Sequence, residues 1–104
     1  MKNNETLPFE IWEIDHADRT VTLLHEQGVY YLSYLYESNE ELVEIAEGGY
    51  VVASGWEYRV HSIQLTKVID ENDIFVAPSW SNEQITQIKN YIEYETEREL
   101  NGWD

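Results

Sequence analysis

Residues 81–99, SNEQITQIKNYIEYETERE, predict a C-terminal helix and so exclude an all-β chain. Ser81 stands three residues before Gln84, the spacing of a capping box, in which the two side chains bind backbone donors left free at a helix N-terminus. Isoleucines follow at helical spacing, at Ile85, Ile88 and Ile92. We therefore expect a helix over about residues 82–99 whose isoleucine face packs on the rest of the chain.

Upstream of this helix, apolar and polar residues alternate in short segments, which is typical of half-buried strands. Residues 9–15 and 20–25 predict a β-hairpin around a polar turn. Residues 29–36 carry apolar side chains on both alternating faces, so we expect a strand that is central or covered. Further strands are expected at residues 50–53, 56–69 and 74–77.

A second, shorter helix is expected to begin at Ser38. Ser38 and Glu41 have the spacing of a capping box, and Gly48 and Gly49 supply the left-handed backbone that ends helices. Its apolar face would contain Leu42, Ile45 and Ala46. The sequence thus predicts a single α+β domain over residues 1–104, with an antiparallel sheet of five or six strands, one short helix and one longer C-terminal helix.

The composition is strongly acidic, because 21 Asp and Glu oppose six Lys and Arg and give a formal net charge of −15. A hydrophobic fraction of 42% still supplies a core. Cysteine is absent, which excludes disulfides and thiolate metal sites. Residues 1–10 lack the apolar core of a secretory signal and no run approaches the length of a membrane span, so we expect a cytoplasmic protein.

Five glutamates crowd the expected short helix: Glu37, Glu40, Glu41, Glu44 and Glu47. Glu40, Glu44 and Glu47 would form one line, because side chains three or four residues apart share a helix face. No Lys or Arg lies within residues 28–56 to pair with them. This first acidic group fits either a solvated helix face or a contact surface for a partner.

The last two turns of the C-terminal helix carry a second acidic group: Glu93, Glu95, Glu97 and Glu99. The helix dipole presents partial negative charge there, so each carboxylate is disfavoured by about 0.3–1 kcal/mol at most. Glu95 and Glu99 continue the line of the isoleucines, and we therefore expect the helix to run past the core and project its end into solvent. A frayed acidic terminus is the alternative.

The sequence contains no recognised catalytic or metal-binding motif. Its histidines lack a known ligand spacing: His16, His25 and His61. Ser54 precedes Gly55, but Val52 stands where a nucleophile elbow needs glycine. The acidic turn at residues 70–73 lacks the glycine and the following oxygen ligand of a calcium loop. We therefore expect no enzyme activity, no cofactor and no metal.

The density of charge decides what the acidic side chains could do. Spread evenly over a folded surface of roughly 6,100 Å², the excess would give about one charge per 400 Å². Duplex DNA, treated as a cylinder, carries roughly one per 110 Å². Gathered onto about a quarter of the surface, the carboxylates would therefore match a nucleic acid in charge density.

From this density we expect a small acidic protein inhibitor, a nucleic-acid mimic that blocks the basic nucleic-acid-binding surface of a partner protein or nuclease through the two acidic groups. Two settings fit equally: a phage or mobile-element protein with an anti-restriction or anti-CRISPR role, and an immunity protein against a nuclease toxin. Six cationic side chains are too few for direct nucleic-acid binding. The alternative is an acidic accessory or assembly domain whose protein partner does not bind nucleic acid.

Overall fold

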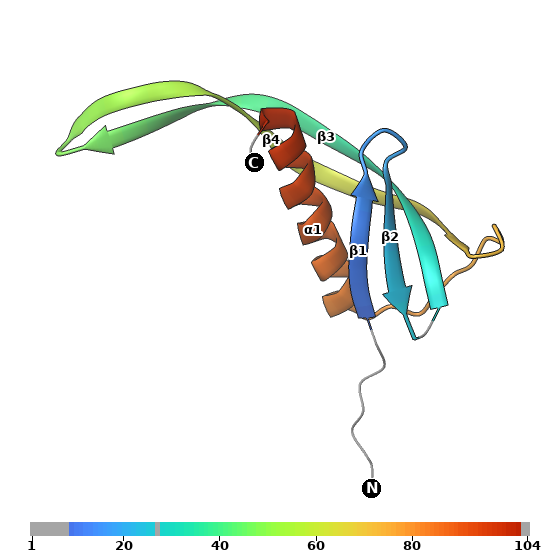
Figure 1. Ribbon diagram of the computed structural model, residues 1–104. Coiled ribbons are helices and arrows are strands. Elements are labelled where there is room, and N and C mark those ends of the chain that lie inside the picture. The colour runs from blue at the N-terminus through green and yellow to red at the C-terminus, as the bar shows by residue number, and fades with distance from the viewer. Residues whose placement is uncertain (1–8, 27, 103–104) are drawn as a thin grey trace, which may run out of the picture.

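The computed structural model describes residues 9–26 and 28–102, which form an antiparallel sheet and a helix (Figure 1). Within these residues the sheet has four strands in the order β1-β2-β3-β4. The elements are β1 (Phe9–Asp15), β2 (Thr20–His25), β3 (Gly28–Glu47), β4 (Tyr50–Asp70) and α1 (Asn82–Asn101). The predicted α+β class with an antiparallel sheet is confirmed. The predicted five or six strands and two helices are not found.

Two expectations concern membranes and secretion. Residues 1–8, which make up most of the stretch tested for a secretory signal, lie outside the described residues. In the part of the chain that the structure describes, no helix combines the length and the apolar character needed to cross a bilayer.

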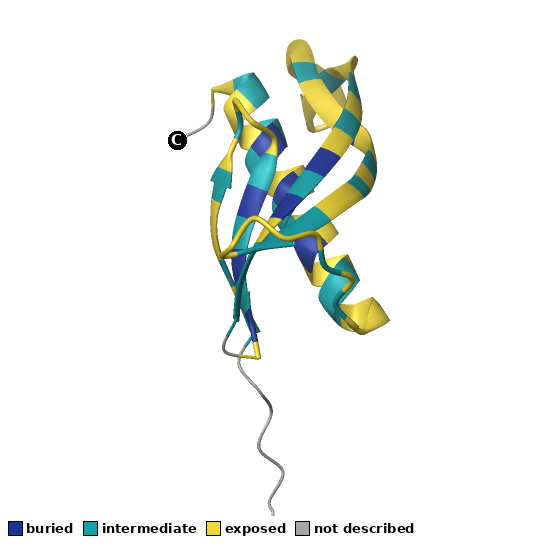
Figure 2. Cartoon of the chain, turned by 90° about the vertical axis from the view of Figure 1, so that its right-hand side faces the viewer, coloured by how far each residue is buried: buried dark blue, intermediate teal, exposed yellow. Residues whose placement is uncertain are grey.

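The core lies between α1 and one face of the sheet. Its buried side chains are Val21, Leu23, Leu32, Tyr34, Ile88 and Ile92. They alternate along β2 and β3 and are four residues apart in α1, as the predicted hairpin and C-terminal helix require. In Figure 2 the buried positions on strands and helix lie where these elements face one another.

The predicted capping box of α1 is present. The backbone N–H of Gln84 donates to Ser81 Oγ at 3.1 Å, and the N–H of Ser81 donates to Gln84 Oε1 at 3.0 Å. Gly102, in the left-handed region with φ of 70°, caps the other end. The helix therefore ends two residues beyond the predicted position.

The residues expected to form a short helix are the outer half of β3. Gly48 and Gly49 have φ of 56° and 86°, values that suit the two-residue turn of a hairpin as well as a helix end. Every residue of 39–47 pairs with a residue of β4. The helix prediction is wrong because the strand after the turn supplies backbone partners along the whole segment, and this pairing outweighs the local capping signals.

β4 also unites segments that were expected to be separate strands. Ser54 and Gly55 were expected to turn the chain, but they pair with Glu44 and Val43 inside one continuous strand. Residues 74–77 were expected to form a strand, and they contribute only the isolated bridge between Phe75 and Ile69. These two differences, with the lost helix, account for the smaller number of elements.

Beyond the end of α1, β3 and β4 continue as a two-stranded ribbon that projects from the rest of the molecule (Figure 1). We call residues 39–59, from the Asn39–Arg59 pair to the glycine turn, the arm. The structure describes the arm throughout, and none of its side chains is buried. Backbone pairing and cross-strand contacts therefore hold the arm, without a core of its own.

Tyr34 makes the stability of this core sensitive to high pH. Burial raises the pKa of its phenol above 10.0, and the nearby Thr96 hydroxyl offsets part of this rise. Above pH 10 the unfolded chain ionises this tyrosine while the folded chain keeps the proton, so the free energy of unfolding falls as pH rises.

We expect Tyr34→Phe to remove this contribution. The difference in free energy of unfolding between wild type and variant should be constant below pH 10. Above pH 10 it should shift in favour of the variant by up to about 1.4 kcal/mol per pH unit. Urea denaturation from pH 8 to 11 measures it, and a difference that stays constant over this range would contradict the prediction.

Candidate interaction surface

The five glutamates of the first acidic group lie on β3, where they divide between the two faces of the ribbon. Each of the three irregularities in the β3–β4 register places its extra residue on β4, so side chains alternate without interruption along β3. Glu40 and Glu44 therefore share one face, and Glu37, Glu41 and Glu47 share the other. The predicted single line through Glu40, Glu44 and Glu47 is wrong because it assumed helical spacing.

Charges in the arm are poorly balanced. The arm holds five glutamates and one arginine. Glu41 lies directly opposite Glu57, a like-charge pair that destabilises a ribbon. Arg59 Nη2 contacts Glu57 Oε2 at 3.1 Å and offsets part of this repulsion. The stability of the arm itself therefore does not explain why so many carboxylates lie on it.

The C-terminal end of α1 docks on β4 at the root of the arm. The N–H of Val60 donates to Glu97 Oε2 at 2.8 Å. The side-chain amide of Asn101 pairs with the backbone of Tyr58 in both directions: Oδ1 accepts from the N–H at 2.8 Å and Nδ2 donates to the carbonyl at 3.1 Å. At Tyr58 and Val60, side chains of α1 therefore bind the backbone groups that a neighbouring strand would otherwise bind. The expected projection of the helix end into solvent is wrong because Asn101, past the predicted helix end, supplies this contact.

The four glutamates of the second acidic group consequently have different surroundings. Glu97 takes part in the docking of α1, and Glu95 Oε1 contacts Arg98 Nη1 at 3.3 Å. Glu93 and Glu99 are exposed. Because α1 ends beside the root of the arm, the two acidic groups, far apart in sequence, are neighbours in the fold.

We expect Glu97→Ala to lower the free energy of unfolding by about 1–3 kcal/mol, because the N–H of the buried Val60 loses its acceptor. Glu99→Ala, two residues further along the helix at an exposed position, is the matched control and should change it by less than about 0.5 kcal/mol. Urea denaturation of the three proteins measures the difference. Equal losses in both variants would show that Glu97 does not hold the helix end.

The arm also exposes large apolar side chains. These are Leu42, Ile45, Tyr50, Val51, Val52, Trp56 and Tyr58. Trp56 is 66% exposed and Tyr50 is 77% exposed. An aromatic patch beside an acidic one was a possible protein-binding face from the sequence, but its place on one ribbon was not predicted. The helix prediction assigned Leu42 and Ile45 to an apolar helix face that would have packed on the core. The signal that could have found this surface is the Gly48–Gly49 pair taken as a hairpin turn between two β-rich segments.

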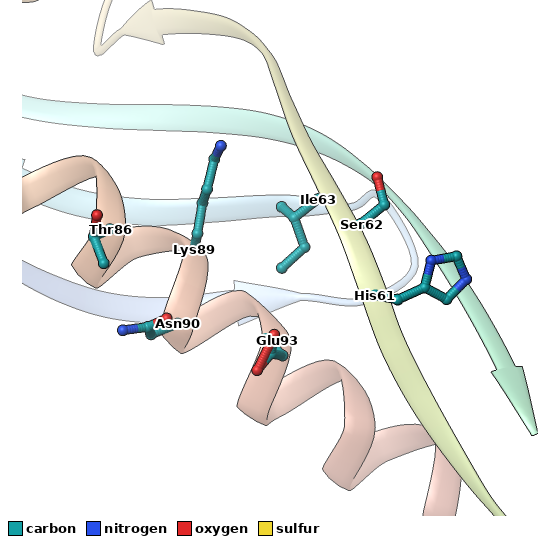
Figure 3. A pocket seen from close by; sticks show the side chains of 7 residues that line it. All are labelled: His61, Ser62, Ile63, Thr86, Lys89, Asn90 and Glu93. Atoms are coloured by element: carbon teal, nitrogen blue, oxygen red, sulfur yellow. The ribbon is translucent and has the colours of Figure 1, made fainter. Parts of the chain in front are cut away.

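A shallow pocket of about 290 Å³ lies between β4 and α1 (Figure 3). Its polar lining includes His61, Lys89 and Glu93. Figure 3 shows these side chains pointing in different directions, without converging on one point. Among the described residues, no three His, Asp or Glu side chains are grouped so that they could hold a metal ion. The arm and the adjoining end of α1 are therefore the better candidate for a functional surface.

Comparisons of the chain with protein-family models, with curated proteins and with solved structures find no match.

Proposed function

We propose that this protein is a small inhibitor that acts by stoichiometric binding, without catalysis, and that it occupies the basic nucleic-acid-binding surface of a partner protein or nuclease. The observation that carries the proposal is the arm: a projecting ribbon with five glutamates, one arginine and no buried side chain. A projecting ribbon can enter a groove built to hold a nucleic-acid strand. The candidate contacts are the glutamates of β3, with Glu93 and Glu99 beside the root of the arm.

The spacing of the carboxylates supports a partial mimic of a single strand. From Glu37 to Glu47, β3 carries five glutamates over about 33 Å, or one per roughly 7 Å of strand. One strand of B-DNA carries a phosphate every 3.4 Å or so along the axis. Counted over both faces, the ribbon therefore presents about half the linear charge of one DNA strand, and a partner that contacts one face meets at most three of the five glutamates. This charge is enough for salt-sensitive attraction to a basic channel.

Two biological settings agree with this proposal. A phage or mobile-element protein would use such an arm to block a defence nuclease, as in anti-restriction or anti-CRISPR inhibition. An immunity protein would use it to guard a cell against a nuclease toxin. Both settings need the same chemistry, an acidic ribbon that competes with nucleic acid for one protein surface.

A second candidate is an acidic accessory or assembly domain whose partner does not bind nucleic acid. The observation that favours it is the set of exposed apolar side chains on the arm, since Trp and Tyr are effective anchors in protein interfaces whatever the charge of the partner. Binding to such a partner would depend more on these side chains than on the glutamates.

Competition with single-stranded and duplex DNA separates the two candidates. The immobilised full chain is incubated with lysate of its native cell at about 50 mM and about 300 mM salt, a range over which exposed charge pairs are progressively screened. A partner on the proposed surface is released by the higher salt and, at low salt, by added single-stranded or duplex DNA. A specific partner that neither treatment releases would overturn the inhibitor proposal and favour the accessory domain.

A further inference from the structure

The outer part of the arm contains a pocket of about 230 Å³, which we call the arm pocket. Its apolar lining comes from Val43 and Ile45 on β3 and from Ala53 and Gly55 on β4, and Glu57 also lines it. Each of these two apolar β4 residues pairs directly with one of the two β3 residues, so the four apolar positions lie on one face of the ribbon. Because small-molecule sites measure roughly 300–1,000 Å³, a pocket of this size fits a single side chain of a partner protein.

The arm pocket opens on the side of the sheet opposite α1. Side chains alternate without interruption along β3, and Tyr34, at an even-numbered position, packs with the isoleucines of α1 in the core. The odd-numbered Val43 and Ile45 therefore point to the opposite side. Every residue that lines the pocket is described, and α1 supplies none of them. In the part of the chain that the structure describes, no element other than β3 and β4 lies beside the outer part of the arm (Figure 1).

Gly55 leaves space in the arm pocket although the backbone does not require a glycine there. Its φ lies outside the left-handed region, and it stands in a run of regular pairs from Ala53 to Glu57. A Cβ atom at this position would have no neighbour within 4 Å. A glycine inside a strand weakens the strand, and where there is no bulge or sharp bend it marks close approach by another molecule. The missing side chain thus indicates that the pocket has an occupant.

Carboxylates flank the arm pocket on the side of the root. Glu41 and Glu57 form the next pair on the same face, roughly 7 Å from the pair of Val43 and Gly55. Glu57 contacts Arg59 at 3.1 Å, whereas no Lys, Arg or His among the described residues contacts Glu41. A purely apolar occupant would take these carboxylates out of water without neutralising them, which is costly. A cation on an apolar stem suits both the pocket and the carboxylates.

We propose that the arm pocket binds an arginine side chain of a basic partner protein. The methylene groups of the arginine lie over Gly55 and against Val43, and the guanidinium group reaches Glu41 beside Glu57. Arginine suits this site better than lysine, because its guanidinium group is more weakly hydrated and can donate two parallel hydrogen bonds to one carboxylate. The proposal rests on the proposed function in one respect, that the surface of the partner is basic.

Titration of the isotope-labelled full chain with a blocked Gly-Arg-Gly tripeptide, followed by NMR, tests this proposal with a defined probe. We expect the largest amide shifts at Val43, Ala53 and Gly55. The dissociation constant should be on the order of 1–10 mM, because one apolar stem and one exposed charge pair support only weak binding. The same peptide with citrulline in place of arginine keeps a similar stem but carries no charge, and it should bind about 5-fold more weakly.

Gly55→Val fills the arm pocket and should leave the fold intact, because the added atoms meet open space and β-branched residues favour strands. Ser54→Val, at the next position and on the opposite face, is the matched control. We expect Gly55→Val to weaken binding of the arginine peptide at least about 10-fold and Ser54→Val to leave it unchanged. Far-UV circular dichroism and thermal unfolding check the fold of both variants.

A second pair of variants changes charge without filling the pocket. Glu41→Gln should weaken binding of the arginine peptide about 3-fold, whereas Glu44→Gln, on the opposite face, should leave it unchanged. Equal binding of the citrulline peptide, shifts confined to other acidic positions, or equal effects in a variant and its control each overturn the proposal.

This proposal and the proposed function fail separately. A pocket that does not bind the arginine peptide leaves the salt and DNA competition of a captured partner unaffected, because exposed carboxylates elsewhere on the arm can still attract a basic surface. If DNA does not release the partner but Gly55→Val alone weakens its binding, the arginine site stands and the inhibitor proposal falls.

Discussion

Changing Glu40, Glu44 and Glu47 together to Lys should weaken binding to a basic partner by about 100-fold at low salt, while the domain stays folded. The arm would then carry four cations and two carboxylates in place of one cation and five carboxylates. Each exposed charge pair contributes up to about 1 kcal/mol, and three reversals turn attraction into repulsion, so a loss of about 3 kcal/mol is expected. The side chains of Glu40, Glu44 and Glu47 are exposed and touch no core residue, so unfolding should change little.

Titration of a captured partner with each variant measures this loss, and urea denaturation reports on the fold. The matched control reverses Glu10, Glu13 and Glu26 to Lys, which makes the same change in net charge on exposed residues at the other side of the sheet. The control should retain most of the affinity. If both triple variants lose affinity equally, net charge alone attracts the partner; if neither loses it, the arm is not the contact.

Leu23→Ala should lower the free energy of unfolding by about 2–5 kcal/mol, whereas Leu42→Ala should lower it by less than about 0.5 kcal/mol. Leu23 is fully buried between the sheet and α1, and its truncation leaves a cavity. Leu42 stands on the arm with about half of its surface in water, facing Trp56 across the ribbon. The same truncation therefore lowers the free energy of unfolding much more between the sheet and α1 than in the arm.

Urea denaturation of the two variants gives both values under one set of conditions. A small effect of Leu42→Ala would mean that the apolar side chains of the arm contribute little to the free energy of unfolding. This result would agree with a role in binding. A loss in Leu42→Ala comparable with that in Leu23→Ala would instead show that the arm contributes to the stability of the fold, and would weaken the proposed role of the arm in binding.

The sequence was sufficient to predict those elements that pack on the core. Ile88 and Ile92 pack against Val21 and Leu23, and burial on one face imposes a helical period on α1 and a period of two on β2. The capping box at Ser81 and Gln84 marks the start of the helix because its geometry is local. Periodicity and local geometry can be read from a single sequence.

The arm could not be predicted in the same way, because neither of its faces is buried. Leu42, Val43 and Ile45 lie on both sides of the ribbon, so no inside face selects one period over another. Ser38, Glu41 and the glycine pair then carry local signals that fit a helix as well as a strand and hairpin turn. The choice between them depends on the distant segment 50–60, which pairs with residues 38–47 of β3.

The sequence was sufficient to predict which glutamates belong to the candidate surface, but not how they are arranged on it. The order of residues locates the carboxylates in two parts of the chain, and the contact of Asn101 with Tyr58 brings these parts together at the root of the arm. Which carboxylates share a face depends on the secondary structure. The wrong helix prediction at residues 38–47 therefore gave a wrong grouping of the glutamates. The role of Glu97 in docking depends on its contact with Val60, which no local pattern reveals.

The docking of α1 has a consequence for the order of events during synthesis on the ribosome. Asn101 follows its partner Tyr58 by 43 residues, so the sheet is complete in the chain before the residue that covers its edge exists. At about 5–20 residues per second, the ribosome needs roughly 2–9 s to add that stretch. During this interval the outer edge of β4 at Tyr58 and Val60 lacks the groups of α1 that later bind it, and neighbouring nascent chains on one messenger RNA have the opportunity to pair with it.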